Sequence, residues 1–351
     1  MDGLRAISIL LVILGHLGGT QNYPNCLYFF GYYSNFGVRV FFVISGYLIT
    51  KLLIEEKFKN GFISLKEFYF RRAVRILPAA YVFITIVALI FHNSTKLEIL
   101  GGYFYFTNYI TSHWQYGHLW SLANEEQFYF IWPLLCAFLF TRARKLAIIG
   151  ILIGPIFRIG FYFSHARIGY WFPVTCDALA TGCFLAFIWE CLDKFRKIII
   201  SPKYIVISIG IVLGVPLLHL GPHSFRAIYN SVGLTLLHLA IACLIYAGVV
   251  CAPKWLNKPI MVWIGVLSYS LYLWQEIFLY RDSREWWTAF PQNLILTFGV
   301  AAASYYLVEK PALQFRGTLL RILHQSGKSK RADEEIPRKE NGTTMAGLKD
   351  P

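Results

Sequence analysis

The chain has 351 residues, of which 56% are hydrophobic and only 15% are charged, and its formal net charge is +14. This composition is typical of integral membrane proteins and argues against a soluble globular domain. Nucleic acid is not an expected partner, because the positive charge lies in a few short loops and in the C-terminal tail.

Apolar runs recur along almost the whole chain, and each has the length of about 17 to 23 residues that suits a bilayer. We predict an all-α, polytopic membrane protein with about ten transmembrane helices. The predicted spans are residues 4–19, 36–54, 77–92, 118–140, 145–163, 171–189, 203–220, 228–250, 259–280 and 291–309. The segment 97–112 is apolar but aromatic and broken by glycines, so we interpret it as interfacial or re-entrant. The first run lacks a small-residue cleavage site and is expected to be retained.

The basic residues indicate how these spans are oriented. With the N-terminus in the cytoplasm, the inside segments and Arg5 hold 26 of the 33 Lys and Arg residues, whereas the outside loops hold 5. The inside segments are 51–76, 142–145, 190–203, 251–258 and the tail from residue 310. We therefore predict a multi-pass protein of the cell (inner) membrane with both termini cytoplasmic. The membrane domain is expected to cover residues 1–315, and the polar residues 316–351 are expected to form a disordered cytoplasmic tail.

The first apolar run carries charge where a simple membrane anchor has none. Asp2 and Arg5 lie at its start, and His16 lies deep within it. On a helix, Arg5 and His16 are about three turns apart, so they share one face at about 16 Å along the axis. Polar groups in a lipid-embedded helix are costly and often functional, and histidine is the usual general base at neutral pH. An alternative stays open, in which Arg5 reaches the headgroups and His16 makes a buried hydrogen bond.

Residues 64–76 predict a short, basic amphipathic helix on the cytoplasmic surface. Ser64 and Glu67 form a capping-box pattern at its start, and Pro78 is expected to end it. Arg72 and Arg75 share a helix face, and arginines on the cytoplasmic side could bind phosphate groups. The alternative is that they only anchor the chain against anionic lipid.

Two adjacent acidic residues lie inside a predicted span. Glu125 and Glu126 are about two turns into residues 118–140, which is costly unless they are paired or line a wet cavity. They could orient His16 or stabilise its charged form. The alternative is a structural ion pair with Arg39 or Arg158.

Other polar residues within the apolar runs are interpreted as structural. Asp177 is predicted to pair with Arg158 across neighbouring helices. His113 and His118 lack the spacing to a third ligand that a metal site requires, so we predict no metal site.

Together these stretches resemble the acyltransferase-3 family of integral membrane acyltransferases. The motifs are Asp2-Gly3-Leu4-Arg5 with His16, Phe41-Phe42-Val43-Ile44-Ser45-Gly46, Arg72-Ala73-Val74-Arg75, and Trp120-Ser121-Leu122 with Glu125-Glu126-Gln127-Phe128-Tyr129. Each motif alone is weak, but all of them occur in the same order over about residues 1 to 315.

The resemblance implies an enzyme that moves an acyl group, usually acetyl, from cytoplasmic acyl-CoA to a hydroxyl of an extracytoplasmic glycan or glycolipid. Acyl-CoA is then a donor substrate, and no bound cofactor is expected. The catalytic residues implied are His16, Arg5, Glu125 and Glu126. The substrate-binding residues implied are Arg72, Arg75, Asp2, Ser45, Trp120 and Ser121.

Three positions depart from the family pattern. Met1 stands where the family usually has leucine, Arg39 where an acidic residue is common, and Gln275 where histidine often follows Leu-Trp. We therefore expect no proton-transfer role at position 275. A proton-coupled transporter of a small solute is the alternative function, because intramembrane Arg, His and Glu also mark proton relays. Against it, the sequence shows no inverted repeat.

Overall fold

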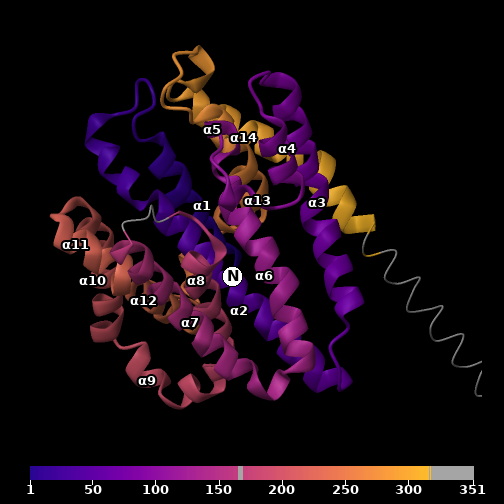
Figure 1. The fold of residues 1–351 in the computed structure, drawn as a ribbon, viewed down its shortest axis with the longest axis vertical. Coiled ribbons are helices and arrows are strands. Elements are labelled where there is room, and N and C mark those ends of the chain that lie inside the picture. Colours follow the sequence, from indigo (N-terminus) through magenta and orange to yellow (C-terminus); the bar gives the residue numbers. More distant parts are fainter. Residues whose placement is uncertain (165–168, 316, 318–351) are drawn as a thin grey trace, which may run out of the picture.

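The computed structural model describes residues 1–164, 169–315 and 317, and every regular element in this part of the chain is helical (Figure 1). The α-helices are α1 Asp2–Leu17, α2 Ser34–Asn60, α3 Leu65–Ile90, α4 Lys96–Tyr103, α5 Trp114–Gly117, α6 Leu119–Phe138, α7 Phe140–Phe163, α8 Phe172–Lys194, α9 Arg196–Ile199, α10 Pro202–Leu217, α11 His223–Ile228, α12 Leu234–Cys251, α13 Pro259–Phe278 and α14 Gln292–Ser304. Short 3-10 or π segments are η1 Asn25–Tyr33, η2 Thr107–Tyr109, η3 Leu218–Leu220, η4 Tyr229–Gly233, η5 Lys254–Asn257, η6 Trp286–Thr288 and η7 Tyr305–Glu309. The predicted tail from residue 316 lies outside the described residues, except for residue 317.

The chain is an all-helical, multi-pass membrane protein. Within the described residues, 7 helical segments are long and apolar enough to cross a membrane. The predicted number of about ten spans is not confirmed. The three remaining predicted spans fall on α1, which has 16 residues, on α6, which contains two glutamates, and on the 13-residue α14 with η7.

Helix α3 corrects one prediction. The predicted surface helix over 64–76 and the span over 77–92 form a single helix, so the expectation that Pro78 ends the first of them is wrong. Proline removes a backbone donor, but within a membrane a neighbouring helix can bond the backbone near the proline. Here the Tyr269 hydroxyl of α13 donates to the Ile76 carbonyl at 2.9 Å. This bond ties α13 to α3 beside Pro78, whereas the carbonyl that Pro78 leaves without a helical partner is that of Val74.

The N-termini of α3 and α4 show which of the capping patterns in the sequence are formed. Ser64 accepts a hydrogen bond from the Glu67 backbone N–H, but its own N–H donates to Glu56, so the predicted capping box is only half formed. A complete capping box begins α4 at Thr95 and Glu98. The segment 97–112 forms only the 8-residue α4 and the 3-residue η2, which confirms that it is not a full span.

Small residues set which helices touch. Helices α2 and α8 pack so closely that a Cβ on Gly46 would lie 2.0 Å from the Leu179 carbonyl oxygen. A Cβ on Gly265 of α13 would lie 2.1 Å from the Asp2 carbonyl oxygen of α1. Because Gln275, further along α13, contacts His16, further along α1, these two helices run parallel. Close approach through small residues is the usual way that membrane helices associate.

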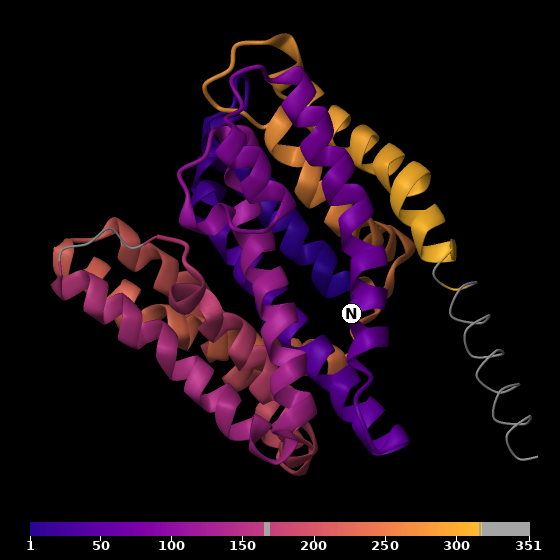
Figure 2. The same ribbon diagram turned by 45° about the vertical axis from the view of Figure 1, so that its right-hand side comes forward.

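The arrangement places the start of α1 inside the molecule. Helices α7, α8, α10 and α12 lie on one side, α3, α13 and α14 lie on the other, and the N-terminus lies near the middle (Figures 1 and 2). Since Arg5 and Ser45 line one cavity, the part of α2 that follows Ser45 extends about 22 Å beyond this level. The start of α1 therefore does not lie at an end of the molecule.

Candidate active site

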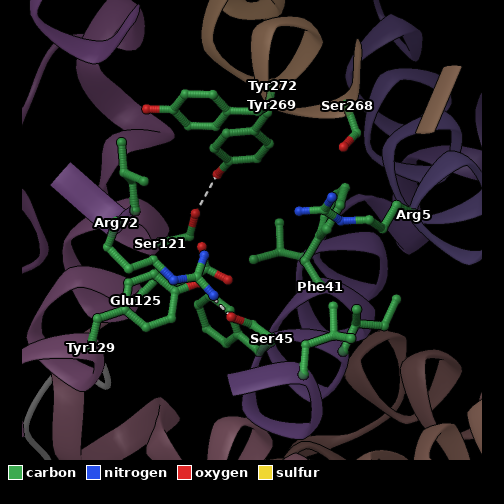
Figure 3. Close-up of a pocket in the computed structure, with 15 residues that line it drawn as sticks. Arg5, Phe41, Ser45, Arg72, Ser121, Glu125, Tyr129, Ser268, Tyr269 and Tyr272 are labelled. Carbon is green, nitrogen blue, oxygen red and sulfur yellow. Dashed lines mark hydrogen bonds between the residues drawn. The ribbon is translucent and has the colours of Figure 1, made fainter. Parts of the chain in front are cut away.

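A cavity between α1, α2, α3, α6 and α13 gathers many of the predicted site residues. Arg5, Ser45, Arg72, Ser121 and Glu125 all line it, with a volume of about 80 Å³. In Figure 3, Arg5 points in from one side, and Arg72 and Glu125 come from the other. The structure thus brings together residues from four motifs that are far apart in the sequence.

The cavity is strongly charged. The Glu125 carboxyl group lies in the cavity with Arg5 and Arg72 and is attracted by both of them and by Arg75. Arg72 also stacks over the Tyr129 ring, with its guanidinium carbon 4.5 Å from the ring centroid. Glu125 is therefore the acidic member of a cluster of arginines.

Neither acidic residue of α6 pairs as the alternative interpretation proposed. Arg39 contacts His238, and Arg158 contacts Asp177, so neither pairs with Glu125 or Glu126 in the described structure.

Glu125 and Glu126 point to different places. Glu126 lines a separate surface cleft, in which Arg72 also takes part. No hydrogen bond or ion pair of the described residues joins either glutamate to His16.

A second surface groove leads to Arg72 from the loop between α2 and α3. It has a volume of about 450 Å³ and is lined by the last turns of α2 and the first turns of α3. The charge of Arg71 is already paired in this groove, because Arg71 forms ion pairs with Glu56 at 3.2 Å and with Glu67 at 2.9 Å. Arg72 and Arg75 line the same groove, and Arg72 also lines the central cavity. Arg72 is thus part of the wall of both the groove and the cavity.

His16 lies in a polar group formed with α13. Its Nδ1 lies 3.1 Å from Gln275 Oε1, and its Nε2 lies 3.8 Å from Glu276 Oε1. Because an amide oxygen only accepts, Nδ1 carries the proton and Nε2 carries a lone pair in the neutral ring. A proton gained at Nε2 would then face a carboxylate. The side chain of His16 is 18% exposed, so the ring is accessible.

Glu276 is the residue that sequence reasoning missed. It is 5% exposed, and its Oε2 accepts a hydrogen bond from the His118 backbone N–H at 3.1 Å and lies 3.1 Å from His118 Nδ1. The available signal was an acidic residue inside the predicted span 259–280, next to Gln275. His118, dismissed as a metal ligand, belongs to the same group.

A short chain of hydrogen bonds joins this group to the central cavity. The Tyr272 hydroxyl donates to the His118 carbonyl at 2.8 Å and lies 2.6 Å from Ser121 Oγ. Ser121 and Tyr272 both line the cavity. The group around His16 and the central cavity are therefore linked through α13 and the start of α6.

Two of the predicted substrate-binding residues line neither the central cavity nor the groove that Arg75 lines. Trp120 stacks on Tyr170, with ring centroids 4.1 Å apart, and meets Phe42 edge-on. The Asp2 backbone packs against Gly265, and Asp2 lies in the first turn of α1, where a carboxylate favours the helix dipole. Among the described residues, no group of three His, Cys, Asp or Glu side chains could hold a metal.

The predicted pair of Arg158 and Asp177 is confirmed. Arg158 Nη2 donates to Asp177 Oδ2 at 2.8 Å, and both side chains are fully buried. A buried charge pair of this kind is costly to break, because either partner alone would leave an uncompensated charge.

The fold and this site define a polytopic helical membrane protein with charged and polar side chains gathered between its helices. The chain belongs to the acyltransferase-3 family, whose acyltransferase domain matches residues 1–309.

The relatives of the chain carry names from the same class. It is 33% identical to the O-acetyltransferase OatA of Staphylococcus aureus strain NCTC 8325 / PS 47, and equally to OatA of strain COL. Each match covers 89% of this chain but only 56% of OatA, so the chain spans about half the length of these relatives. No solved structure matches the chain. These matches confirm the resemblance read from the motifs and give no support to the transporter alternative.

Proposed function

We propose that the chain transfers an acetyl group from cytoplasmic acetyl-CoA to a hydroxyl of an extracytoplasmic glycan or glycolipid. The observation that carries the proposal is the His16 ring, held by Gln275 and facing Glu276, on the same helix as the cavity-lining Arg5. The relatives named O-acetyltransferase favour acetyl over a longer acyl group.

The donor is proposed to enter from the groove at the α2–α3 loop. This loop is cytoplasmic if the charge asymmetry of the loops sets the orientation. Arg72 and Arg75 would bind the phosphates of CoA by charge-assisted hydrogen bonds, whereas Arg71 is already paired with two glutamates. The acyl-bearing arm of CoA would then pass Arg72 into the central cavity.

Arg5 is proposed to hold this arm. Arg5 and His16 are about 16 Å apart along α1, so Arg5 cannot contact the thioester while it reacts beside His16. Glu125 is proposed to position Arg5 and Arg72, both of which attract its carboxyl group. Ser45, hydrogen bonded to Tyr129, lines the path beside them.

The chemistry is proposed to run through His16 Nε2. This atom takes the proton of the acceptor hydroxyl while the hydroxyl oxygen attacks the thioester carbonyl. Gln275 holds Nδ1–H and so fixes the tautomer, and Glu276 stabilises the imidazolium. When the C–S bond breaks, the proton passes to the thiolate, which leaves as CoA, and the acetyl ester remains on the acceptor.

A transfer assay with purified protein in proteoliposomes tests the proposal. Labelled acetyl-CoA on the α2–α3 loop side is expected to yield free CoA and a labelled glycan. Glu276→Gln removes the carboxylate but keeps the size of the side chain, and it should lower kcat while leaving acetyl-CoA binding unchanged. Uptake of a solute driven by a pH gradient, with no covalent product, would instead support a transporter.

A further inference from the structure

A second cavity lies on the other side of α2, between its first turns and helices α7, α8 and α12. It has a volume of about 420 Å³, and Arg39 and Arg158 line it. The donor groove lies at the opposite end of α2, beside Glu56 and Lys59. Along α2 the two sites are about 30 Å apart, which is the thickness of the hydrocarbon core of a bilayer. They therefore lie at opposite ends of a helix that is long enough to cross the bilayer.

One arginine of this cavity, Arg158, donates to several other residues of the protein. Arg158 donates to the Asn230 carbonyl at 2.6 Å, to the Val174 carbonyl at 2.6 Å and to Asp177 Oδ2 at 2.8 Å. Asp177 Oδ2 also accepts from the Thr235 hydroxyl at 2.9 Å. Arg158 and Asp177 thus form a fixed, neutral pair that supports the wall of the cavity.

The other arginine is held in place but not neutralised. Arg39 Nη1 lies 3.0 Å from His238 Nε2. A guanidinium only donates, so Nε2 accepts and the proton of the neutral imidazole is on Nδ1, which lies 3.2 Å from Asp177 Oδ2. No carboxylate of the described residues lies within ion-pair distance of Arg39. Its charge and its remaining N–H groups are therefore available to the cavity.

We propose that this cavity binds an anionic group, a carboxylate or a phosphate, on the sugar of the acceptor. That the bound sugar is the acceptor rests on the proposed function; that the cavity selects an anion rests on Arg39 alone. The planar fork of a guanidinium matches both anions. Phe36 and Tyr170 add aromatic surface and Asn35 adds an amide beside it, which suit a sugar ring and its hydroxyls.

Binding measurements on the full-length protein in nanodiscs of uncharged lipid test this inference. The probes are glucuronic acid, glucose 1-phosphate and glucose, so that the carboxylate, the phosphate and the neutral sugar are compared separately. The wild type should bind at least one anionic sugar about ten- to a hundredfold more tightly than glucose. Arg39→Gln should abolish that preference, although its amide can still donate to His238.

Two further variants make the result decisive. Arg226→Gln removes an exposed cation from α11, outside the cavity lining, and should leave the preference unchanged. Arg39→Lys keeps the charge but loses the planar guanidinium, so it should weaken binding of the anionic sugar. If Arg39→Gln fails to insert into the membrane, Arg39→Lys still tests whether the guanidinium binds the anion. Equal binding of all three sugars by the wild type, or wild-type affinity in the Arg39 variants, would overturn the inference. A protein that selects the anion through Arg39 but transfers no acetyl group would refute only the proposed function.

Discussion

At the scale of single residues, the surroundings of His16 can be compared with what a structural and a catalytic role would each require. A histidine that only makes a buried hydrogen bond needs one partner, and Gln275 supplies it. The ring of His16 has in addition a free lone pair on Nε2, partial exposure and a carboxylate 3.8 Å away. These are the features that a general base requires.

Replacement of His16 is expected to remove transfer without unfolding the protein. His16→Gln can still form a hydrogen bond but cannot take a proton at neutral pH, so kcat should fall roughly 10²- to 10⁴-fold, as in His16→Ala. Initial rates with labelled acetyl-CoA measure the loss, and thermal unfolding in detergent is the control. A normally inserted His16→Gln protein with full activity would return His16 to a structural role.

Glu98 gives a stability prediction with a defined dependence on pH. Burial alone would raise its pKa, but hydrogen bonds from the backbone N–H groups of His113 and Thr95, the Thr95 hydroxyl and the His113 ring lower that pKa below its ordinary value. The ionised group therefore stabilises the fold above its pKa in the unfolded chain, and this contribution disappears as pH falls through the folded-state pKa.

Glu98→Gln should accordingly destabilise the protein at neutral pH by about 0.5 to 2 kcal/mol, the range for loss of a helix cap. The difference in melting temperature from the wild type should shrink toward pH 3. A difference that stays constant over the whole pH range would show that the charge of Glu98 has no part in it.

At the scale of elements, α3 joins the membrane surface to the centre of the protein. It is continuous through Pro78, and its first turns carry three arginines with different surroundings. Arg71 is neutralised by two glutamates, whereas Arg72 and Arg75 face the groove and the cluster around Glu125. Only the latter two are therefore expected to serve the donor.

The three arginines can be compared on the same helix. Arg72→Ala and Arg75→Ala should each weaken binding of acetyl-CoA by roughly 1.5 to 3 kcal/mol, or about ten- to a hundredfold in Kd. Arg71→Ala is the matched control and should change Kd little. Equal weakening in all three variants would point to a general effect of net charge, and no weakening in Arg72→Ala and Arg75→Ala would leave them as topology anchors.

At the scale of the whole molecule, the donor groove lies at one end of α2, whereas His16 and the second cavity lie near the other. Gly15, next to His16, packs against Ser34 at the start of α2, and Ser34 also lines the second cavity. The parallel course of α1 and α13 places the first residues of α1 and the loop before α13 on the same side. This is consistent with the orientation predicted from the basic residues.

Accessibility labelling tests that orientation. Single cysteines at Lys59 and Arg284, both exposed, are introduced into a protein that lacks its native cysteines. An impermeant thiol reagent outside intact cells should label position 284 and should label position 59 only after permeabilisation. Labelling of position 59 from outside would contradict the predicted topology and the direction of transfer proposed from it.

The sequence by itself determined the properties that depend on neighbours along the chain. Apolar length and loop charge predicted a helical membrane protein, and helical periodicity put Arg5 and His16 on one face of α1. The i, i+3 spacing likewise put Arg72 and Arg75 together. The family followed from motifs that keep their order over about residues 1 to 315, and the family's domain matches residues 1–309.

Only the tertiary structure decided which helix faces meet. Gly265 allows α13 to lie against the start of α1, and this packing brings Gln275 and Glu276 to His16. Glu125, the sequence candidate for that place, instead lies among arginines. Periodicity fixes the face on which a side chain lies, but its partner depends on contacts between segments more than 250 residues apart, as the separation of 259 residues between His16 and Gln275 shows. No local pattern along the sequence encodes such a contact.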